Sequence, residues 1–273
     1  MGLYDPWSEV RRITSLLLEK ILPLLPVAFT ERLYLHMLHS CQLCIGNKSD
    51  WKRTHGLLLG MQKVIRWSTS ERQHQGVTLL PDGLFSPGSG TVDLLFSCLG
   101  HCQQAVQKVG QSALLTVSGA LGSAGMLDLL DAVTHMAWEQ KSKSQKHRQQ
   151  EGTEYTKTEL EIEAGRGGII HAKTGEGLLG VLRQVIPKVP IEALRVRWRK
   201  LMMLLKGLWW HEASAVRQLV SSVLQQVAQR HGFAVLVIGG IANAWDELGA
   251  QWQGWEGALM TYEAILKDIL NTH

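Results

Sequence analysis

One short stretch near the start of the chain returns, in altered form, in its last third. Segments 5–21 and 211–227 align without a gap. The residue types that they share include Ser8 with Ser214, Val10 with Val216, Arg11 with Arg217, and Ser15 with Ser221. Both segments carry apolar residues at helical spacing, so each is expected to form a long helix. A helical phrase that recurs in one chain favours an architecture of stacked helical hairpins.

A second phrase recurs in the same order. The segment that begins at Trp51 resembles the one that begins at Trp252, and Gly56 then aligns with Gly257. Each Trp phrase follows its Val-Arg pair by about forty residues, near the length of a helical repeat. Glycine inside a helix costs about 1 kcal/mol relative to alanine. We therefore expect each glycine to admit the close approach of a neighbouring element.

The Asp-to-Arg spacing resembles a known repeat family. Asp5 is placed to cap a helix with Pro6 at its first position. Asp followed six residues later by Arg, with Val before the Arg, resembles the second helix of HEAT repeats. That resemblance implies an all-α, ARM/HEAT-type α-solenoid with a polar Asp–Arg ladder; in the second copy His211 replaces the Asp. The residues of this repeat signature are Asp5, Val10, Arg11, Trp51, Gly56, Val216, Arg217, Trp252 and Gly257.

Apolar periodicity, together with glycine and proline stops, predicts about five helical hairpins. The expected helices are 5–22, 30–45, 49–67, 91–104, 105–121, 126–138, 175–186, 190–209, 212–231, 234–248 and 254–270. They form an N-terminal block, 1–138, with a Gly- and Pro-rich loop insertion at 68–90, and a C-terminal block, 169–273. Residues 139–168 carry few apolar side chains and are expected to form a disordered linker.

Composition indicates a folded protein of a reducing compartment. The chain is 45% hydrophobic and 19% charged, which is ordinary for a globular protein. Its net charge of +4 is too mild to demand a nucleic acid. Four cysteines do not suggest a disulfide framework, so we expect a cytoplasmic or nuclear protein. The longest apolar run, Phe233 to Ala242, is too short to span a bilayer, so no membrane partner is expected.

The motifs that could carry chemistry have structural interpretations. Gly175–Gly180 fits GxGxxG, but no βαβ unit follows, so we interpret it as a turn at a helix start. Phe233–Gly240 resembles a first Rossmann strand but fits a buried helix better. A second set of residues has metal-ligand spacing but does not converge on one helix face. It comprises His36, His39, Cys41, Cys44, His101, Cys98 and Cys102. We therefore expect no catalytic residue, metal or cofactor.

A basic helix supplies the candidate partner-binding residues. They are Arg195, Arg199, Lys200 and Lys206. The leading interpretation is a non-catalytic scaffold or adaptor that binds a protein partner. The alternative is an accessory RNA- or tRNA-binding subunit, which would also use the basic run Lys141–Arg148. A nucleotide-binding enzyme built on Gly175–Gly180 is a third alternative.

The two ends of the chain carry apolar faces. A solenoid exposes its interior at each terminus unless a capping repeat covers it. The relevant residues are Val10, Ile13, Leu17 and Ile21 in the first helix, and Leu259, Ile265, Leu266 and Ile269 in the last. We expect a segment of a larger solenoid that associates with itself, or with a partner, through these ends. Within the repeat, Val216→Asp should unfold the C-terminal block, and Arg217→Ala should be much milder.

Overall fold

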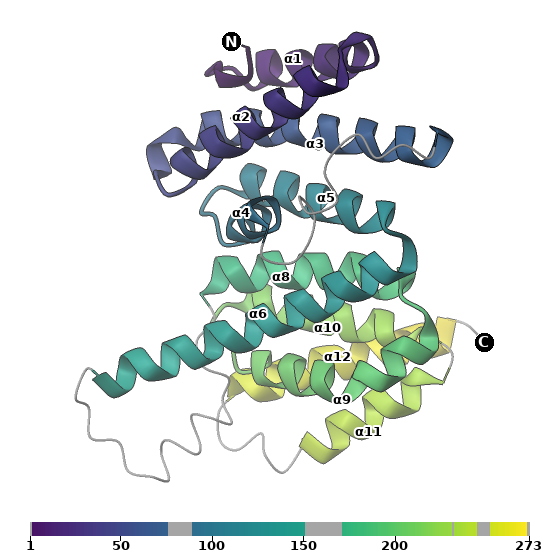
Figure 1. Ribbon diagram of the computed structural model, residues 1–273. Helices are drawn as coiled ribbons and strands as arrows, with labels where there is room; N and C mark the ends of the chain where they lie inside the picture. Colours follow the sequence, from purple (N-terminus) through teal and green to yellow (C-terminus); the bar gives the residue numbers. More distant parts are fainter. Residues whose placement is uncertain (1, 76–88, 151–170, 231, 245–251, 272–273) are drawn as a thin grey trace. The chain divides into compact units, whose positions relative to one another are not determined.

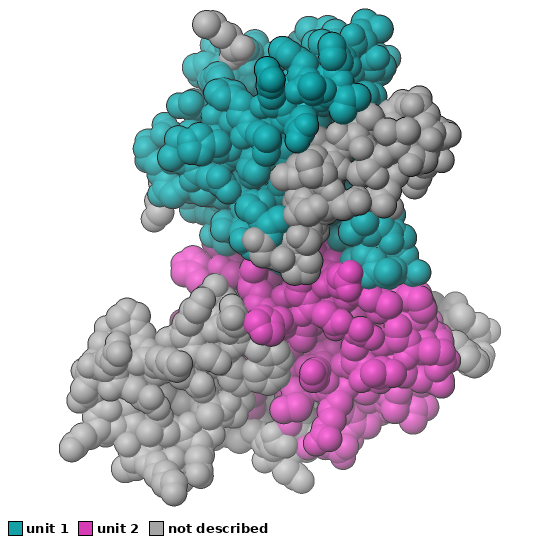
Figure 2. Space-filling view, viewed as in Figure 1, with its two compact units in different colours: residues 1–126 teal, residues 127–273 magenta. Residues whose placement is uncertain are grey.

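The protein is all-helical in the part of the chain that its structure describes. The computed structural model covers residues 2–75, 89–150, 171–230, 232–244 and 252–271, with eleven α-helices and no strand among them (Figure 1). The all-α prediction is confirmed. The chain divides into two compact units, which are coloured separately in Figure 2. Unit 1 comprises residues 1–126 and unit 2 comprises residues 127–273.

Unit 1 is built from helices that pack on their near neighbours in sequence. Its elements are η1 (Gly2–Tyr4), α1 (Ser8–Ile21), η2 (Leu22–Leu24), α2 (Val27–Ile45), η3 (Lys48–Asp50), α3 (Trp51–Gln75), α4 (Gly90–Leu99) and α5 (Gln104–Ala120). The helices α1, α3 and α5 form one row, with α3 in contact with both others. The helices α2 and α4 contact each other, and they pack on α3 and α5 respectively.

Unit 2 likewise consists of one row of helices and a second set of helices packed on that row. Helix α6 (Gly122–Gln150) begins at the end of unit 1 and runs into unit 2. The other elements are α8 (Ala172–Val185), η5 (Ile186–Lys188), α9 (Ile191–Leu208), α10 (Ser214–Ala228), α11 (Phe233–Ala244) and α12 (Trp252–Asn271). The helix α10 contacts α8 on one side and α12 on the other, so these three form a row (Figure 1). The helices α9 and α11 contact each other and α10.

Two hairpin corners each contain a pair of prolines at the same spacing. Pro23 and Pro187 each follow a fully buried residue and lie in a 3-10 turn, η2 or η5. Proline cannot donate a backbone hydrogen bond, so the preceding helix stops there, as predicted. The second prolines, Pro26 and Pro190, then cap α2 and α9. The second helix therefore begins at Val27, three residues before the start that we predicted at residue 30.

The structure corrects two predicted boundaries. Helix α3 extends to Gln75 and α6 to Gln150, so residues 68–75 and 139–150 are helical rather than loop or disordered. These segments are rich in Gln, Lys, Glu and Arg, which are good helix formers and continue a helix without an apolar face. Ser89 caps α4 and Gly90 begins it, and the remaining residues of the two predicted insertions, 76–88 and 151–168, lie outside the described residues.

The apolar faces at the chain ends are largely exposed. Val10, Ile13, Leu17 and Ile21 face solvent, whereas the buried positions of α1 are Arg11, Ser15 and Leu18. In α12, Leu259 and Leu266 are exposed as expected. Ile265 is buried, so that part of the prediction is wrong, because its face of α12 turns towards the unit. The side chain of Ile269 lies outside the described residues.

Candidate partner-binding surface

A buried arginine organises the start of α1. The Arg11 side chain is almost fully buried, and its Nη1 donates to the carbonyl oxygens of Asp5 (2.5 Å) and Pro6 (2.8 Å). Its guanidinium carbon lies 5.8 Å from the ring centre of Trp51 on α3. Its Nε donates to Nδ1 of His55 at 3.4 Å. Arg11 therefore closes the turn before its own helix and joins that helix to the next one in the row.

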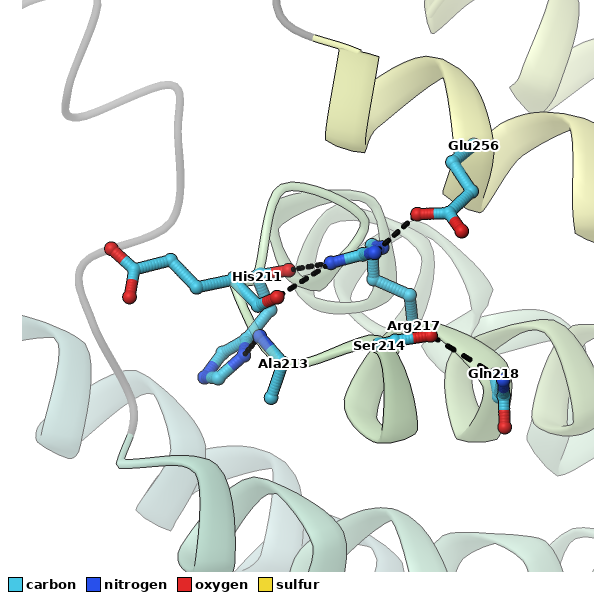
Figure 3. A network of polar contacts seen from close by, with 7 residues as sticks. His211, Ala213, Ser214, Arg217, Gln218 and Glu256 are labelled. Atoms are coloured by element: carbon cyan, nitrogen blue, oxygen red, sulfur yellow. Dashed lines mark hydrogen bonds and ion pairs between the residues drawn. The ribbon is translucent and has the colours of Figure 1, made fainter.

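Arg217 makes the same arrangement in unit 2 (Figure 3). Its Nη1 donates to the carbonyl oxygens of His211 (2.6 Å) and Glu212 (2.8 Å), at the same sequence offsets as in the first copy. Its guanidinium lies 5.2 Å from the ring centre of Trp252 and pairs with the carboxylate of Glu256. The two repeated segments of the sequence thus form one recurring contact, in which one segment supplies the arginine and the other supplies the tryptophan.

The paired glycines make room for the turn that precedes each arginine helix. A Cβ on Gly56 would lie 1.7 Å from the carbonyl oxygen of Leu3 and 2.8 Å from Cδ of Arg11. A Cβ on Gly257 would lie 3.0 Å from Cδ1 and 3.1 Å from the carbonyl oxygen of Trp209. Leu3 and Trp209 occupy matching places in the alignment that pairs Arg11 with Arg217. The predicted close approach is confirmed at both glycines.

The change from Asp5 to His211 leaves the turn intact. The carboxylate of Asp5 accepts the Trp7 N–H at 2.8 Å, and Nδ1 of His211 accepts the Ala213 N–H at 3.0 Å. Both side chains therefore satisfy the amide two residues on. Because the neighbouring arginines bond to main-chain carbonyls, neither needs a carboxylate at this position. Asp5 bonds to Arg11 of its own segment through its main-chain carbonyl, and its side chain accepts the Trp7 N–H, so the ladder expected from the HEAT resemblance does not use the Asp5 carboxylate in the hydrogen bonds described.

A third copy of this turn lies before α5, and the sequence reasoning missed it. Nδ1 of His101 accepts the Gln103 N–H at 3.0 Å. Gln107 occupies the arginine position and donates to the carbonyl oxygen of Leu99 at 3.1 Å. The residue before it, Val106, is fully buried. The signal was present: a side-chain acceptor followed six residues later by a polar residue that directly follows valine.

Acidification is expected to destabilise unit 1. Burial lowers the pKa of His55 and His101 below the usual 6.5, and the Arg11 cation also lowers the pKa of His55. Both rings accept hydrogen bonds, which requires them to be neutral, whereas the unfolded chain binds protons near pH 6.5. Their contribution is therefore fully present above about pH 6.5 and is lost as the pH falls through the lowered folded-state pKa. Urea unfolding followed across this range measures it.

The matched control is His101→Asn. Asn47 accepts the Ser49 N–H at 3.1 Å in the same way, so asparagine can keep the cap without titrating. The variant should show a shallower loss of unfolding free energy on acidification than the wild type. Equal stability of the wild-type protein at about pH 7.5 and 5 would contradict the prediction.

The predicted basic residues lie on α9, but not all are equally open. Arg199 and Lys200 are exposed, and Lys206 is half-buried. Arg195 is exposed too, 3.8 Å from Glu192, and its Nη2 would lie 3.2 Å from a Cβ on Gly232. It therefore rests beside the turn between α10 and α11. The structure brings Arg195, Arg199 and Lys200 together on one exposed strip.

Exposed apolar side chains interrupt this basic strip. Val196 is 82% exposed and Met203 is 53% exposed. We call the strip the α9 face; its residues are Arg195, Val196, Arg199, Lys200 and Met203. They follow one another at helical spacing, so cations and apolar groups present a continuous mixed surface. Sequence reasoning found the charges and missed the apolar pair.

Contacts with α6 and α11 hold the helix that carries the α9 face in place. Arg197, in the middle of the basic run, makes two 2.7 Å hydrogen bonds to the carboxylate of Asp131 on α6. That bond raises the pKa of Arg197. Trp198 packs edge-on against Phe233 of α11, with ring centres 5.8 Å apart. Arg197 is therefore a structural contact and does not belong to the α9 face.

The structure places the other sequence motifs in helices. Gly175 and Gly177 are buried within α8, so these glycines pack inside a helix rather than form the predicted turn. Phe233–Gly240 lies in α11, as expected. Burial raises the pKa of the Cys41 thiol to about 12, which keeps it protonated at neutral pH. Within the described residues, no group of His, Cys, Asp and Glu is placed to hold a metal ion.

Comparison with known proteins returned no relative. No family model, no curated protein and no solved structure matches this chain. Among the described helices, none is both long enough and apolar enough to cross a membrane. The side chains of Lys141–Arg148, on which the RNA alternative also relied, lie outside the described residues.

Proposed function

We propose that this protein is a non-catalytic helical-repeat module of the HEAT class that binds a protein partner. Three features support the repeat class. Helices alternate between a continuous row and a second set of helices within each unit. The arginine-centred contact occurs in both units, and a glutamine variant of its turn precedes α5. Stacked hairpins of this kind create extended surfaces suited to holding other chains.

The observation that carries the binding proposal is the mixed chemistry of the α9 face. Val196 and Met203 offer apolar contact, whereas Arg199 and Lys200 offer charge-assisted hydrogen bonds. A protein segment with apolar and acidic side chains satisfies both kinds of group. A nucleic-acid backbone would satisfy the cations alone and leave the exposed Val196 in contact with phosphate and water. An acidic, amphipathic protein segment is therefore the better-matched partner.

Photo-crosslinking in cells tests this assignment. A photoreactive amino acid at position 196 should yield discrete protein adducts that resist nuclease. The double variant Arg199→Glu, Lys200→Glu should reduce their yield about tenfold, because like charges then face an acidic partner. Leu43, which is 70% exposed on α2 in unit 1, provides the matched control position.

Three results would overturn the proposal. Nuclease-sensitive adducts from position 196, with binding that falls steeply as salt rises, would favour the RNA alternative. Adduct yields that are equal at positions 196 and 43, and insensitive to the double charge reversal, would show that the α9 face is not a binding surface. A nucleotide-dependent rise in melting temperature would instead favour an enzyme.

A further inference from the structure

The outer face of α1 is an apolar strip on which no other helix of the described residues packs. Exposed apolar residues recur along α1 and η2 at intervals of three and four positions, which places them on one side of the helix. They are Val10, Ile13, Leu17, Ile21 and Leu24. Leu17, near the middle, is 59% exposed. We call this strip the α1 face.

The internal repeat shows what covers such a face. In the alignment of Arg11 with Arg217, three of the five α1-face positions correspond to fully buried residues of unit 2: Val216, Val223 and Val227. The other two correspond to Leu219 and Arg230, which are half-buried. Both helices pack on the next helix of their row, α1 on α3 and α10 on α12. In addition, α10 contacts α8, α9 and α11, whereas α1 packs mainly on α3 and the adjacent 3-10 turns. The neighbour that the α1 face lacks is a preceding helix of the row.

The α12 helix shows the opposite deficiency. Its exposed apolar residues are Trp252, Leu259, Tyr262 and Leu266, which we call the α12 face. In the alignment of Trp51 with Trp252, the last three correspond to Leu58, Met61 and Ile65 of α3, all fully buried. The helix α3 differs from α12 in having α5 packed on it. The neighbour that the α12 face lacks is a following helix of the row.

We propose that copies of this chain associate head to tail, with the α12 face of one copy packed on the α1 face of the next. A single contact of the kind that α8 makes with α10 then supplies both missing neighbours. The proposal is independent of the α9 face. Such a contact joins two different surfaces, so each added copy leaves one face of each type open. Assemblies should therefore grow with protein concentration.

The charges beside the two faces do not oppose this contact. Glu9 and Arg12 pair within α1 at 2.5 Å, and Glu263 and Lys267 pair within α12 at 2.6 Å. Each pair is neutral overall, so bringing the faces together sets no uncompensated like charges against each other. Burial of apolar surface is therefore the main driving force, and the association should withstand salt.

Sedimentation velocity of the full chain, over a range of protein concentrations, tests the proposal with two single variants. Leu17→Glu blocks the α1 face and Leu259→Glu blocks the α12 face; both positions are more than half exposed, so neither change enters the core. Each variant alone should be monomeric, with association weakened at least about tenfold by the buried charge. Leu43→Glu, a change at a position of α2 that is 70% exposed and lies outside both faces, should assemble like the wild type.

Mixing the two single variants decides between arrangements. Head-to-tail packing predicts a one-to-one dimer that grows no further, because each variant retains the face that the other has lost. A wild-type chain that stays monomeric at all concentrations would overturn the proposal. So would dimers formed by either variant alone, which would mean that like faces pair, or a mixture that fails to form the dimer.

Discussion

Arg217→Ala is expected to destabilise unit 2 by about 3–5 kcal/mol, the usual effect of removing one partner from a buried ion pair. The Arg217 side chain is 2% exposed, and it satisfies the carbonyls of His211 and Glu212 as well as the carboxylate of Glu256. Alanine would leave these acceptors without their donor and would leave a void beside Trp252. Hydrogen exchange of α10 amides in rising urea measures the change locally.

Two controls separate this effect from a general loss of charge. Arg195→Ala removes an exposed arginine of α9 and should change stability by less than about 0.5 kcal/mol. Arg11→Ala should destabilise unit 1 in the same direction but less, by about 1–3 kcal/mol, because Arg11 bonds to two carbonyl oxygens and His55 rather than to a carboxylate. From sequence alone we expected Arg217→Ala to be mild, and the buried contacts reverse that expectation. A loss below about 1 kcal/mol would mean that the carbonyls find other donors.

Val216→Asp should destabilise unit 2 by more than about 4 kcal/mol, enough to unfold it under ordinary conditions. Val216 is fully buried at the start of α10, so an aspartate there would place an unpaired carboxylate in the core. Circular dichroism and limited proteolysis would report the loss of helix and the new cleavage sites in unit 2.

The repeat provides its own control for this change. Val10 holds the same place in α1 but is 39% exposed in the single chain, so Val10→Asp should cost less than about 1 kcal/mol at protein concentrations where the chain is monomeric. The comparison keeps the residue type, the helix position and the substitution constant and varies only the burial. Similar losses for the two variants would show that burial at this position does not govern stability.

The sequence predicted the fold class better than the element boundaries. The helical periodicity of apolar residues and the positions of prolines predicted where the helices lie. Both signals are local, because amphipathic spacing and the missing N–H of proline act within a few residues. Helices α3 and α6 outran their predicted ends, since a polar helix rich in Gln and Lys keeps its propensity after its apolar face ends. Burial was harder to predict: Val10 and Val216 share a sequence context, and only the presence or absence of a neighbouring helix separates them.

The candidate site was predicted in part for a similar reason. Charge alone marked Arg195, Arg199 and Lys200, but it could not distinguish them from Arg197, whose partner Asp131 lies on another helix. Exposure of Val196 is likewise a tertiary property. The matched arginines were found because repetition is visible in the sequence, yet their hydrogen bonds to main-chain carbonyls were not.

The helix-entry turn has a consequence for mutational drift. The side chains of Asp5, His101 and His211 each accept a hydrogen bond from the main-chain N–H two residues later, although one is a carboxylate and two are imidazoles. Arg11 and Arg217 bond to main-chain oxygens, which every residue type supplies. Exchange of one hydrogen-bond acceptor for another at the position of Asp5, His101 and His211 should therefore change the stability of the turn little. Copies of this turn can therefore lose their sequence identity while they keep their structure. A search that treats Asp, Asn and His as one symbol, six positions before Arg or Gln, would still recognise them.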